Sequence, residues 1–394
     1  MSVIPAFMST AIPILIFILI LGIVVFIHEL GHFVMARRAG VFVEEFALGM
    51  GPKLLGFKGK PRKQRAANPE EGNLIWHGTA PDGITQEEEV TQFSLRLFPI
   101  GGFCKMRGTD ESIPDDPGAL SNKKVYQRAL VMAGGSLFNF IAAFILFFVL
   151  VLLTGYSVAQ VHSITQNSPA YQAGLQPGDR ITHIDGRRVA LFEDFAMQLN
   201  FSGGQPIDVR FVRDGTAHNV AITPVQYENS FRLGFLATRY VGLLGSAPEG
   251  TPRVGFWGTL TTSAEMILFN MRMPFTMLAR FVTGRTLPDG AGVMGPIGLA
   301  GEVTQVYQQV IQYGILDTLL TMLFITALLN AALGVMNLLP IPAMDGARLV
   351  FLGIEGIRRK PVSPEREGMV HMVGFFVLIL LAVFIAYRDI VRLL

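Results

Sequence analysis

Long runs without a charged residue dominate this chain and limit what it can fold into. Three such runs cover Ala11–Ile27, Ala129–Leu153 and Thr318–Met344, and a shorter one covers Met372–Tyr387. A helix that crosses a bilayer needs about 17–25 mostly apolar residues, so the first three runs are long enough and the fourth reaches this length with its neighbours. We therefore expect a multi-pass α-helical membrane protein with about four transmembrane helices, embedded in a lipid bilayer.

The composition agrees with this class. Hydrophobic residues make up 51% of the 394 residues and charged residues only 16%, and the formal net charge is +2. Soluble globular proteins carry about 25% charged residues, and nucleic-acid binders usually carry a clear basic excess. A soluble globule, a disordered chain and a nucleic-acid binder are therefore excluded. The single cysteine, Cys104, excludes an intramolecular disulfide and a CxxC metal site.

The positive charges predict an orientation. No Lys or Arg precedes Arg37, so the first run lacks the basic start of a signal peptide and is expected to stay as a transmembrane helix. Lys and Arg residues cluster after the first run, before the second and after the third. Cytoplasmic loops are richer in Lys and Arg. Segments 33–128 and 346–368 are thus expected inside, and 155–314 outside.

The segments between the apolar runs complete the expected organisation. It comprises a first transmembrane helix (1–40), a cytoplasmic-side segment (41–128), a second transmembrane helix (129–154), a β-rich domain (155–240), an amphipathic helical segment (241–314), a third transmembrane helix (315–346), a cytoplasmic loop (347–368) and a fourth transmembrane helix (369–388). Short β-branched runs separated by turn dipeptides indicate the β-rich domain.

Three details of these segments carry expectations of their own. Residues 93–107 alternate like a hairpin around Pro99-Ile100-Gly101-Gly102. Residues 254–285 are apolar but contain Glu265, Arg272 and Arg280, which favours an amphipathic helix at the outer surface over a fifth span. The stretch 59–91 is long and acidic, and either a regulatory loop or a solvated insertion fits it.

The chemistry concentrates at His28-Glu29-Leu30-Gly31-His32, at the inner end of the first run. On a helix, residues i and i+4 project from one face, so both imidazoles can bind one metal ion. Glu29 lies beside them and can accept a proton from a water that the ion activates. The alternative is three polar side chains that reach the inner lipid headgroups. It is less favoured because polar groups inside a span are costly.

A catalytic zinc ion normally has three protein ligands, so a third is needed. The third run ends in Asn337-Leu338-Leu339-Pro340-Ile341-Pro342-Ala343-Met344-Asp345-Gly346. Its prolines cannot continue a helix, and Asp345 emerges on the same side as the two histidines. Asp345 is therefore the best candidate, although an Asp-Gly turn that ends the span also fits. Asp289 and Asp317 lie toward the outer side and are poorer candidates.

These two motifs together resemble those of the site-2 protease family of intramembrane zinc metalloproteases, and most closely the bacterial regulator-of-sigma-E protease type. The resemblance implies one Zn²⁺ ion with His28, His32 and Asp345 as ligands, and Glu29 as the general base. It implies that Asn337 helps to position the substrate or the developing oxyanion. Pro340 and Pro342 provide extended backbone nearby for the substrate.

Two further stretches match the same family. Gly101-Gly102-Phe103-Cys104-Lys105-Met106 resembles its membrane-reentrant β-loop. The edge of this hairpin can add a substrate strand, so we expect Gly102, Phe103 and Lys105 to bind substrate. Ala133-Gly134-Gly135-Ser136-Leu137-Phe138-Asn139 resembles the motif of its second span, with Gly135 where a proline is more usual.

The domain at 155–240 resembles a bacterial, circularly permuted PDZ domain. Ser168-Pro169-Ala170, Ala173–Asp179 and Ile181–Gly186 follow one another as in such domains. Leu233-Gly234-Phe235 resembles the loop whose backbone N–H groups bind a peptide carboxylate, although an ordinary strand turn also fits these three residues. Many relatives of this type have two tandem PDZ domains, and this sequence indicates one.

The resemblance implies an inner-membrane protease of bacteria that cleaves single-span membrane proteins, such as an anti-sigma factor or a remnant signal peptide, after another protease has trimmed them outside. Two alternatives come from other classes. A non-catalytic PDZ scaffold has no need of Glu29 beside a metal, and a metal transporter usually needs further intramembrane carboxylates. Glu29 therefore favours hydrolysis over both.

Overall fold

The computed structural model describes residues 3–59, 90–109, 113, 116–228, 230–245, 251–284 and 295–393. Most of the acidic stretch 59–91 lies outside these residues. The chain divides into two compact units. One contains Met1–Asn139 and Leu333–Phe384, and the other contains Phe140–Ala332 and Ile385–Leu394.

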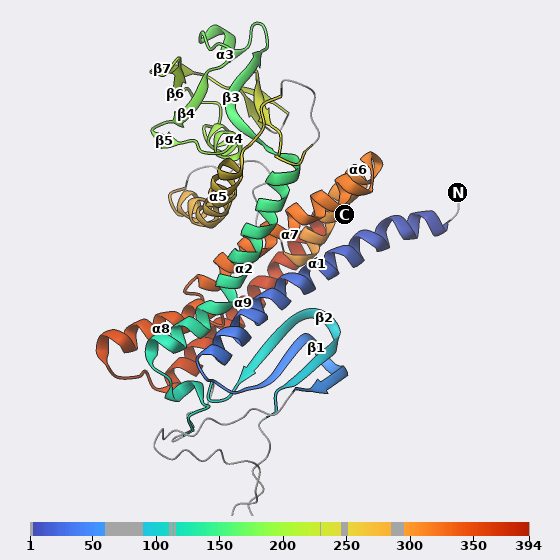
Figure 1. Cartoon of the computed structure of the whole chain (residues 1–394), viewed down its shortest axis with the longest axis vertical. Coiled ribbons are helices and arrows are strands. Elements are labelled where there is room, and N and C mark those ends of the chain that lie inside the picture. The colour runs from blue at the N-terminus through green and yellow to red at the C-terminus, as the bar shows by residue number, and fades with distance from the viewer. Residues whose placement is uncertain are drawn as a thin grey trace, which may run out of the picture. The chain divides into compact units, whose positions relative to one another are not determined.

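Four long helices provide the apolar framework (Figure 1). They are α1 (Val3–Arg38), α2 (Val125–Thr154), α7 (Ile315–Leu338) and α9 (Pro364–Leu393). Each contains a stretch that is long and apolar enough to cross a membrane, and α9 extends beyond the expected 369–388 at both ends. The expectation of about four such helices is therefore confirmed for the described part of the chain.

The third apolar run is shorter as a helix than expected. Helix α7 ends at Leu338, and a new helix, α8 (Asp345–Arg358), begins only after the two prolines. A proline lacks the N–H that an inner helical turn requires and clashes with the preceding turn. The expected helix over 315–346 is thus wrong beyond Leu338, and the expected loop over 347–368 is mostly helical. Asp345 belongs to the first turn of α8.

A β-sheet replaces the expected hairpin over 93–107. Strand β1 (Val43–Lys58) pairs antiparallel with strand β2 (Gln92–Met106). The two halves of β2 do not pair with each other, because the first half of β1 lies between them: Phe46 is the register partner of both Cys104 and Phe93. The hairpin was predicted from local alternation, whereas the observed partner lies some 50 residues earlier in the chain.

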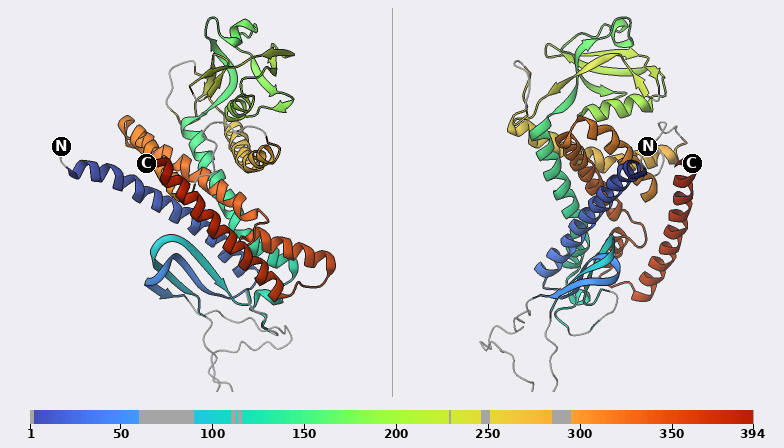
Figure 2. Two further views of the ribbon diagram at one scale, coloured as in Figure 1. Left: turned by 180° about the vertical axis from the view of Figure 1, so that it is seen from behind. Right: turned by 90° about the vertical axis from the view of Figure 1, so that its right-hand side faces the viewer.

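Aromatic side chains hold this sheet against α1. Phe26 and Phe33 of α1 meet Phe46 and Phe93 of the sheet, with ring centroids between 5.4 and 5.8 Å apart. Such edge contacts add about 0.5–1.5 kcal/mol per pair beyond area burial. The sheet runs beside the C-terminal half of α1 in all three views (Figures 1 and 2). This packing brings the last residues of β2 next to the polar end of α1.

The second unit contains the β-rich domain. Its main sheet has the order β10-β3-β4-β6-β7, from β3 (Tyr156–Ile164), β4 (Arg180–Ile184), β6 (Ile207–Arg213), β7 (Thr216–Ile222) and β10 (Phe235–Tyr240). The short β5 (Arg187–Arg188) pairs with β4, and β8 (Val225–Tyr227) pairs with β9 (Ser230–Arg232). Helices α3 (Pro169–Gln172) and α4 (Phe192–Phe201) complete the domain.

The domain has a hydrophobic core and an ion pair whose carboxylate is buried. The core is built from inward-facing residues of the strands and α4, including Ile181, Val209 and Phe195. The fully buried carboxylate of Asp179 accepts two hydrogen bonds of 2.7 Å from the Arg213 guanidinium. This bidentate geometry is among the strongest side-chain interactions and joins the turn before β4 to the end of β6.

Helices α5 (Phe256–Val282) and α6 (Pro296–Val310) follow the domain. The three charged residues of α5 all contact the β-rich domain. Glu265 pairs with Arg188 at 2.9 Å, Arg272 pairs with the buried Asp194, and Arg280 donates to the backbone oxygen of Phe201 at 3.1 Å. Helix α5 is not among the described helices that are apolar enough to span a membrane.

Candidate metal centre

Two histidines one helical turn apart on α1 face the same point. The Nε2 atoms of His28 and His32 lie 3.2 Å apart, and the two side chains are nearly buried. The four-residue spacing places both rings on one face of the helix. The sequence pattern and the structure agree on this arrangement.

Asp345 completes a cluster of three potential ligands. Its Oδ2 lies 3.2 Å from Nε2 of His28 and 3.1 Å from Nε2 of His32. Gly346 makes this position possible, because a Cβ there would lie 2.1 Å from the backbone oxygen of Leu339. The break between α7 and α8 thus turns the chain so that the first carboxylate of α8 reaches α1.

The dimensions of the cluster fit a zinc ion. Zinc binds imidazole nitrogen at about 2.0–2.1 Å and carboxylate oxygen at about 2.0–2.2 Å in a tetrahedron. Two ligand atoms of such a tetrahedron lie about 3.3–3.5 Å apart. The three ligand-atom distances of 3.1–3.2 Å are close to this value. Within the described residues this is the one cluster of three His, Cys, Asp or Glu side chains suited to a metal.

Helix α2 forms the back wall of the cluster through glycines. A Cβ on Gly31 of α1 would lie 2.2 Å from the backbone oxygen of Gly134. A Cβ on Gly135 would lie 2.5 Å from Cε1 of His28 and from Nε2 of His32. Both distances are far below van der Waals contact, so α2 can lie against the imidazoles only because these positions carry no side chain. This gives Gly135, the departure from the usual proline, a steric role in this chain.

We expect Gly31→Ala to lower zinc binding and stability, because its Cβ would force α1 and α2 apart. The clash is with backbone, so it cannot be relieved by rotating a side chain; overpacking of this kind typically costs about 1–3 kcal/mol. Gly353→Ala on α8 is the matched control, since a Cβ there meets nothing within 4 Å. Zinc content and the thermal unfolding midpoint would measure the effect. Equal behaviour of the two variants would contradict it.

Glu29 contacts the end of β2. The backbone N–H of Cys104 donates a hydrogen bond to its carboxylate. A Cβ on Gly102 would lie 3.2 Å from Cγ of Glu29 and 2.9 Å from the backbone oxygen of Ala47. The absence of a side chain at Gly102 therefore lets the strand approach Glu29, whose carboxylate is held beside the two histidines.

A cavity of about 680 Å³ opens onto these groups. Its lining includes the candidate ligands, Glu29, and three of the residues expected to bind substrate: Asn337, Phe103 and Lys105. Pro340, Pro342 and Gly102 do not line it; the prolines form the break after α7, and Gly102 packs against Glu29. The Nδ2 of Asn337 donates to the backbone oxygen of Leu333 at 3.1 Å. The structure thus brings Asn337, from the late motif, to the same cavity as the His motif.

Cys104 also lines this cavity but is poorly suited to act as a nucleophile. Burial raises the pKa of its thiol well above the usual range, and the charge of Glu29 acts in the same direction. The thiolate, not the thiol, is the reactive form. A cysteine-protease mechanism is therefore disfavoured.

Two groups on α2 contact the histidines from behind and were not assigned a role from the sequence. The backbone oxygen of Val131 accepts a hydrogen bond from Nδ1 of His32 at 2.9 Å. The side-chain Nδ2 of Asn139 lies 3.3 Å from Nδ1 of His28. A backbone carbonyl leaves no trace in a sequence pattern, whereas Asn139 was visible as a polar residue within an apolar run.

The residues expected to bind a peptide lie together in the β-rich domain. Leu233 is buried in its core, Gly234 has a φ of +82°, and Phe235 begins β10. A Cβ on Gly234 would lie 2.3 Å from Cβ of Ser168, so the turn requires glycine. Strand β10 is the edge strand of its sheet among the described residues, since it pairs only with β3.

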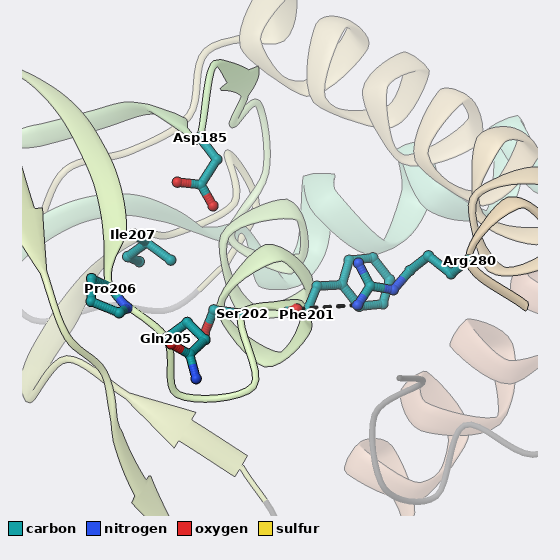
Figure 3. A pocket seen from close by; sticks show the side chains of 7 residues that line it. All are labelled: Asp185, Phe201, Ser202, Gln205, Pro206, Ile207 and Arg280. Atoms are coloured by element: carbon teal, nitrogen blue, oxygen red, sulfur yellow. Dashed lines mark hydrogen bonds between the residues drawn. The ribbon is translucent and has the colours of Figure 1, made fainter. Parts of the chain in front are cut away.

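The second unit has a smaller cavity of about 370 Å³ (Figure 3). Its lining consists of Asp185, Phe201, Ser202, Gln205, Pro206, Ile207 and Arg280. The guanidinium of Arg280 lies 4.1 Å from the centroid of the Phe201 ring and donates to the backbone oxygen of the same residue. Its one cationic group is thus engaged in attaching α5, and the described lining contains neither histidine nor cysteine.

Several known proteins are similar to this chain over almost its whole length. The family model of Peptidase family M50 matches residues 16–65 and 77–381. A Clostridium acetobutylicum protein described as a zinc metalloprotease is 32% identical, and the alignment covers 96% of this chain and 97% of that protein. The zinc metalloprotease RasP of Oceanobacillus iheyensis is 30% identical and covers 96% of this chain and 98% of its own. Among solved structures, the PDZ domain of an SdrC-like protein from Listeria monocytogenes covers 21% of this chain and 88% of that domain at 20% identity, with a TM-score of 0.19.

Proposed function

Because the chain belongs to peptidase family M50 and is a zinc metalloprotease with four helices apolar enough to span a membrane, we propose that it hydrolyses peptide bonds within or near the transmembrane segments of single-span membrane proteins. The observation that carries this proposal is the His28–His32–Asp345 cluster, formed by the C-terminal part of the apolar helix α1 and the first turn of α8 after α7. A peptidase site in this position is accessible to a substrate that lies in the bilayer. The scaffold and transporter alternatives do not agree with the family.

We infer that His28, His32 and Asp345 hold the zinc ion and that Glu29 is the general base. When bound, zinc supplies a Lewis acid that polarises a carbonyl and makes a water more acidic. Glu29 accepts a proton from the attacking water while the oxygen of that water bonds to the peptide carbon. It then donates that proton to the leaving amine nitrogen as the C–N bond breaks. The hydrogen bond from Cys104 N–H keeps the carboxylate in place for both transfers.

Asn337 is proposed to stabilise the developing oxyanion. It lines the cavity beside the cluster, and its amide uses one N–H for the backbone oxygen of Leu333. The second N–H of the same amide is a donor that can meet negative charge on the substrate carbonyl oxygen. One such donor typically contributes about 10²–10³-fold in rate.

The end of β2 is proposed to bind the unwound substrate. A transmembrane helix hides its carbonyls in its own hydrogen bonds, so it must be unwound locally before attack. Residues 102–106 pair with β1 on one side only among the described strands, and Phe103 and Lys105 line the cavity. We propose that this outer strand accepts an added substrate strand next to Glu29, whose carboxylate accepts the hydrogen bond from Cys104 N–H. We propose that Pro340 and Pro342 hold the chain extended on the other side of the bound substrate strand.

The sheet also fits the expected membrane-reentrant loop. Several of its large apolar side chains are exposed: Met50, Leu54, Leu55, Phe57 and Phe98. Exposed apolar side chains in such numbers are typical of a surface that meets a membrane or another protein. Their exposure supports the proposal that the sheet dips into the bilayer near the site.

We expect Phe103→Pro to lower turnover at least about 10-fold while zinc content stays near wild type. A proline removes a backbone N–H and disturbs the strand at the cavity, whereas the metal ligands come from α1 and α8. Lys58→Pro is the matched control because Lys58 lies at the other edge of the same sheet. Peptide cleavage rates and metal analysis would measure both. Parallel loss of turnover and zinc in Phe103→Pro would argue against a substrate-binding role.

The β-rich domain is proposed to act as a single PDZ domain outside the inner membrane of a bacterium. Its Leu233-Gly234-Phe235 turn leads into the edge strand β10, which is the arrangement that strand addition by a peptide C-terminus requires. The partner would be a single-span protein that another protease has already shortened. The alternative role of the domain is to exclude substrates by size until their outer part has been trimmed.

The proposed function can be tested with the purified full chain in detergent and a library of single-span peptides. Mass spectrometry should show cleavage within or next to the apolar segment of a subset of peptides. A zinc chelator should abolish cleavage, and added Zn²⁺ should restore it. Cleavage confined to soluble peptides would contradict the proposed substrate class, and cleavage that persists without zinc would contradict the assigned chemistry.

A further inference from the structure

The two imidazoles of the cluster each have a second nitrogen that faces α2. For His32 the partner is the backbone oxygen of Val131, 2.9 Å from Nδ1. A carbonyl oxygen can only accept, so this contact places the proton of the neutral ring on Nδ1. The lone pair of Nε2 is then directed toward Asp345 and the other imidazole.

The same requirement applies to His28. A neutral imidazole that gives its Nε2 lone pair to a metal carries its proton on Nδ1, so the group facing Nδ1 must accept a hydrogen bond. The structure places Asn139 there, with Nδ2 3.3 Å from Nδ1. An amide nitrogen cannot accept. This contact therefore suits the tautomer whose Nδ1 is unprotonated, not the one that binds metal.

The other end of the Asn139 amide is also unusual. The side chain is fully buried, and its Oδ1 has no hydrogen-bond partner among the described residues. A buried acceptor without a partner is costly, typically about 1–3 kcal/mol. A half-turn of the amide exchanges its two ends without moving the helix. It presents the unpaired oxygen to the Nδ1–H of His28.

We propose that Asn139 is a positioning residue for the zinc site, which accepts a hydrogen bond from Nδ1–H of His28 through Oδ1. It does for His28 what the backbone oxygen of Val131 does for His32, so α2 orients both imidazoles toward one ion. This inference rests on the proposed function, because it takes His28 as a zinc ligand. Partners of this kind typically affect metal affinity by about 10–100-fold.

Three variants of the full chain in detergent test this role. Asn139→Leu keeps the side-chain size and removes the acceptor, Asn139→Asp keeps an acceptor oxygen, and Ser136→Ala removes a different buried polar group of α2. Zinc affinity is measured by competition with a chromophoric chelator. We expect the leucine variant to bind zinc 10–100-fold more weakly and the other two to stay within about threefold of wild type.

Two results would overturn the proposal: wild-type zinc affinity in Asn139→Leu, or equal losses in Asn139→Asp and Asn139→Leu. If the leucine variant fails to fold, as judged by thermal unfolding without metal, Asn139→Ala is used in its place, because it removes the same oxygen. His32→Ala separates this proposal from the function itself. Unaltered zinc binding in His32→Ala would mean that the metal site is wrongly assigned. Loss of zinc binding in His32→Ala together with wild-type zinc affinity in Asn139→Leu would reject only the role of Asn139.

Discussion

Glu29→Gln should reduce peptide cleavage by at least about 10²-fold while leaving one zinc ion bound, because general-base catalysis contributes about 10²–10⁴-fold. The amide keeps the size of the side chain and its place beside Gly102 and Cys104. It cannot accept the proton of the attacking water. Cleavage rates on a single-span peptide, with zinc content measured on the same preparation, give both quantities.

Glu44→Gln is the informative comparison. Glu44 is another carboxylate of the same cavity, but it pairs with Lys105 at 2.9 Å. It should lose far less activity than Glu29→Gln. A larger loss in Glu44→Gln would move the general-base role to Glu44, and unchanged cleavage in Glu29→Gln would reject the assigned mechanism.

Asp345→Asn should abolish stoichiometric zinc binding and activity together. The carboxylate is the one charged ligand of the cluster and lies within 3.2 Å of both Nε2 atoms. A neutral amide oxygen is a weaker zinc ligand and does not offset the positive charge of the ion. Metal analysis after gel filtration would show the loss. Added zinc should raise the unfolding midpoint of the wild type but not of the variant, since a ligand stabilises only the state that binds it.

Asp317→Asn is the control for this substitution. Asp317 is an exposed acidic residue in the first turn of α7, and it was one of the poorer sequence candidates for a third ligand. It should keep both zinc and activity. Full zinc content in Asp345→Asn, or its loss in Asp317→Asn, would place the third ligand elsewhere.

Several parts of the site could be predicted because their signals are local. The four-residue spacing of His28 and His32 implies one helical face whatever surrounds the helix. The prolines at 340 and 342 imply a break in the helix, and the structure has that break before Asp345. Uncharged runs of sufficient length imply transmembrane helices, because the bilayer imposes the length.

Other parts depend on residues that meet only in the folded chain. The pairing of Phe46 with both Cys104 and Phe93 joins segments that are far apart in sequence, so local alternation over 93–107 pointed to the wrong partner. Residues 347–368 were predicted as a cytoplasmic loop from their position between two apolar runs and their basic residues, and neither signal reports whether such a segment is helical. The contact of Asn139 with His28 arises where α2 crosses α1, which no spacing within either helix reveals.

The sequence by itself determined the apolar helices and the pair of histidines, since each follows from the composition or the spacing of one segment. It made Asp345 the best candidate for a third ligand through the proline break before it and through the family resemblance. Only the tertiary structure decided which strand borders Glu29, how α2 approaches through Gly31 and Gly135, and which groups orient the imidazoles. These contacts depend on close packing between segments that are remote in the chain. Such packing is sensitive to single atoms, and sequence patterns do not record it.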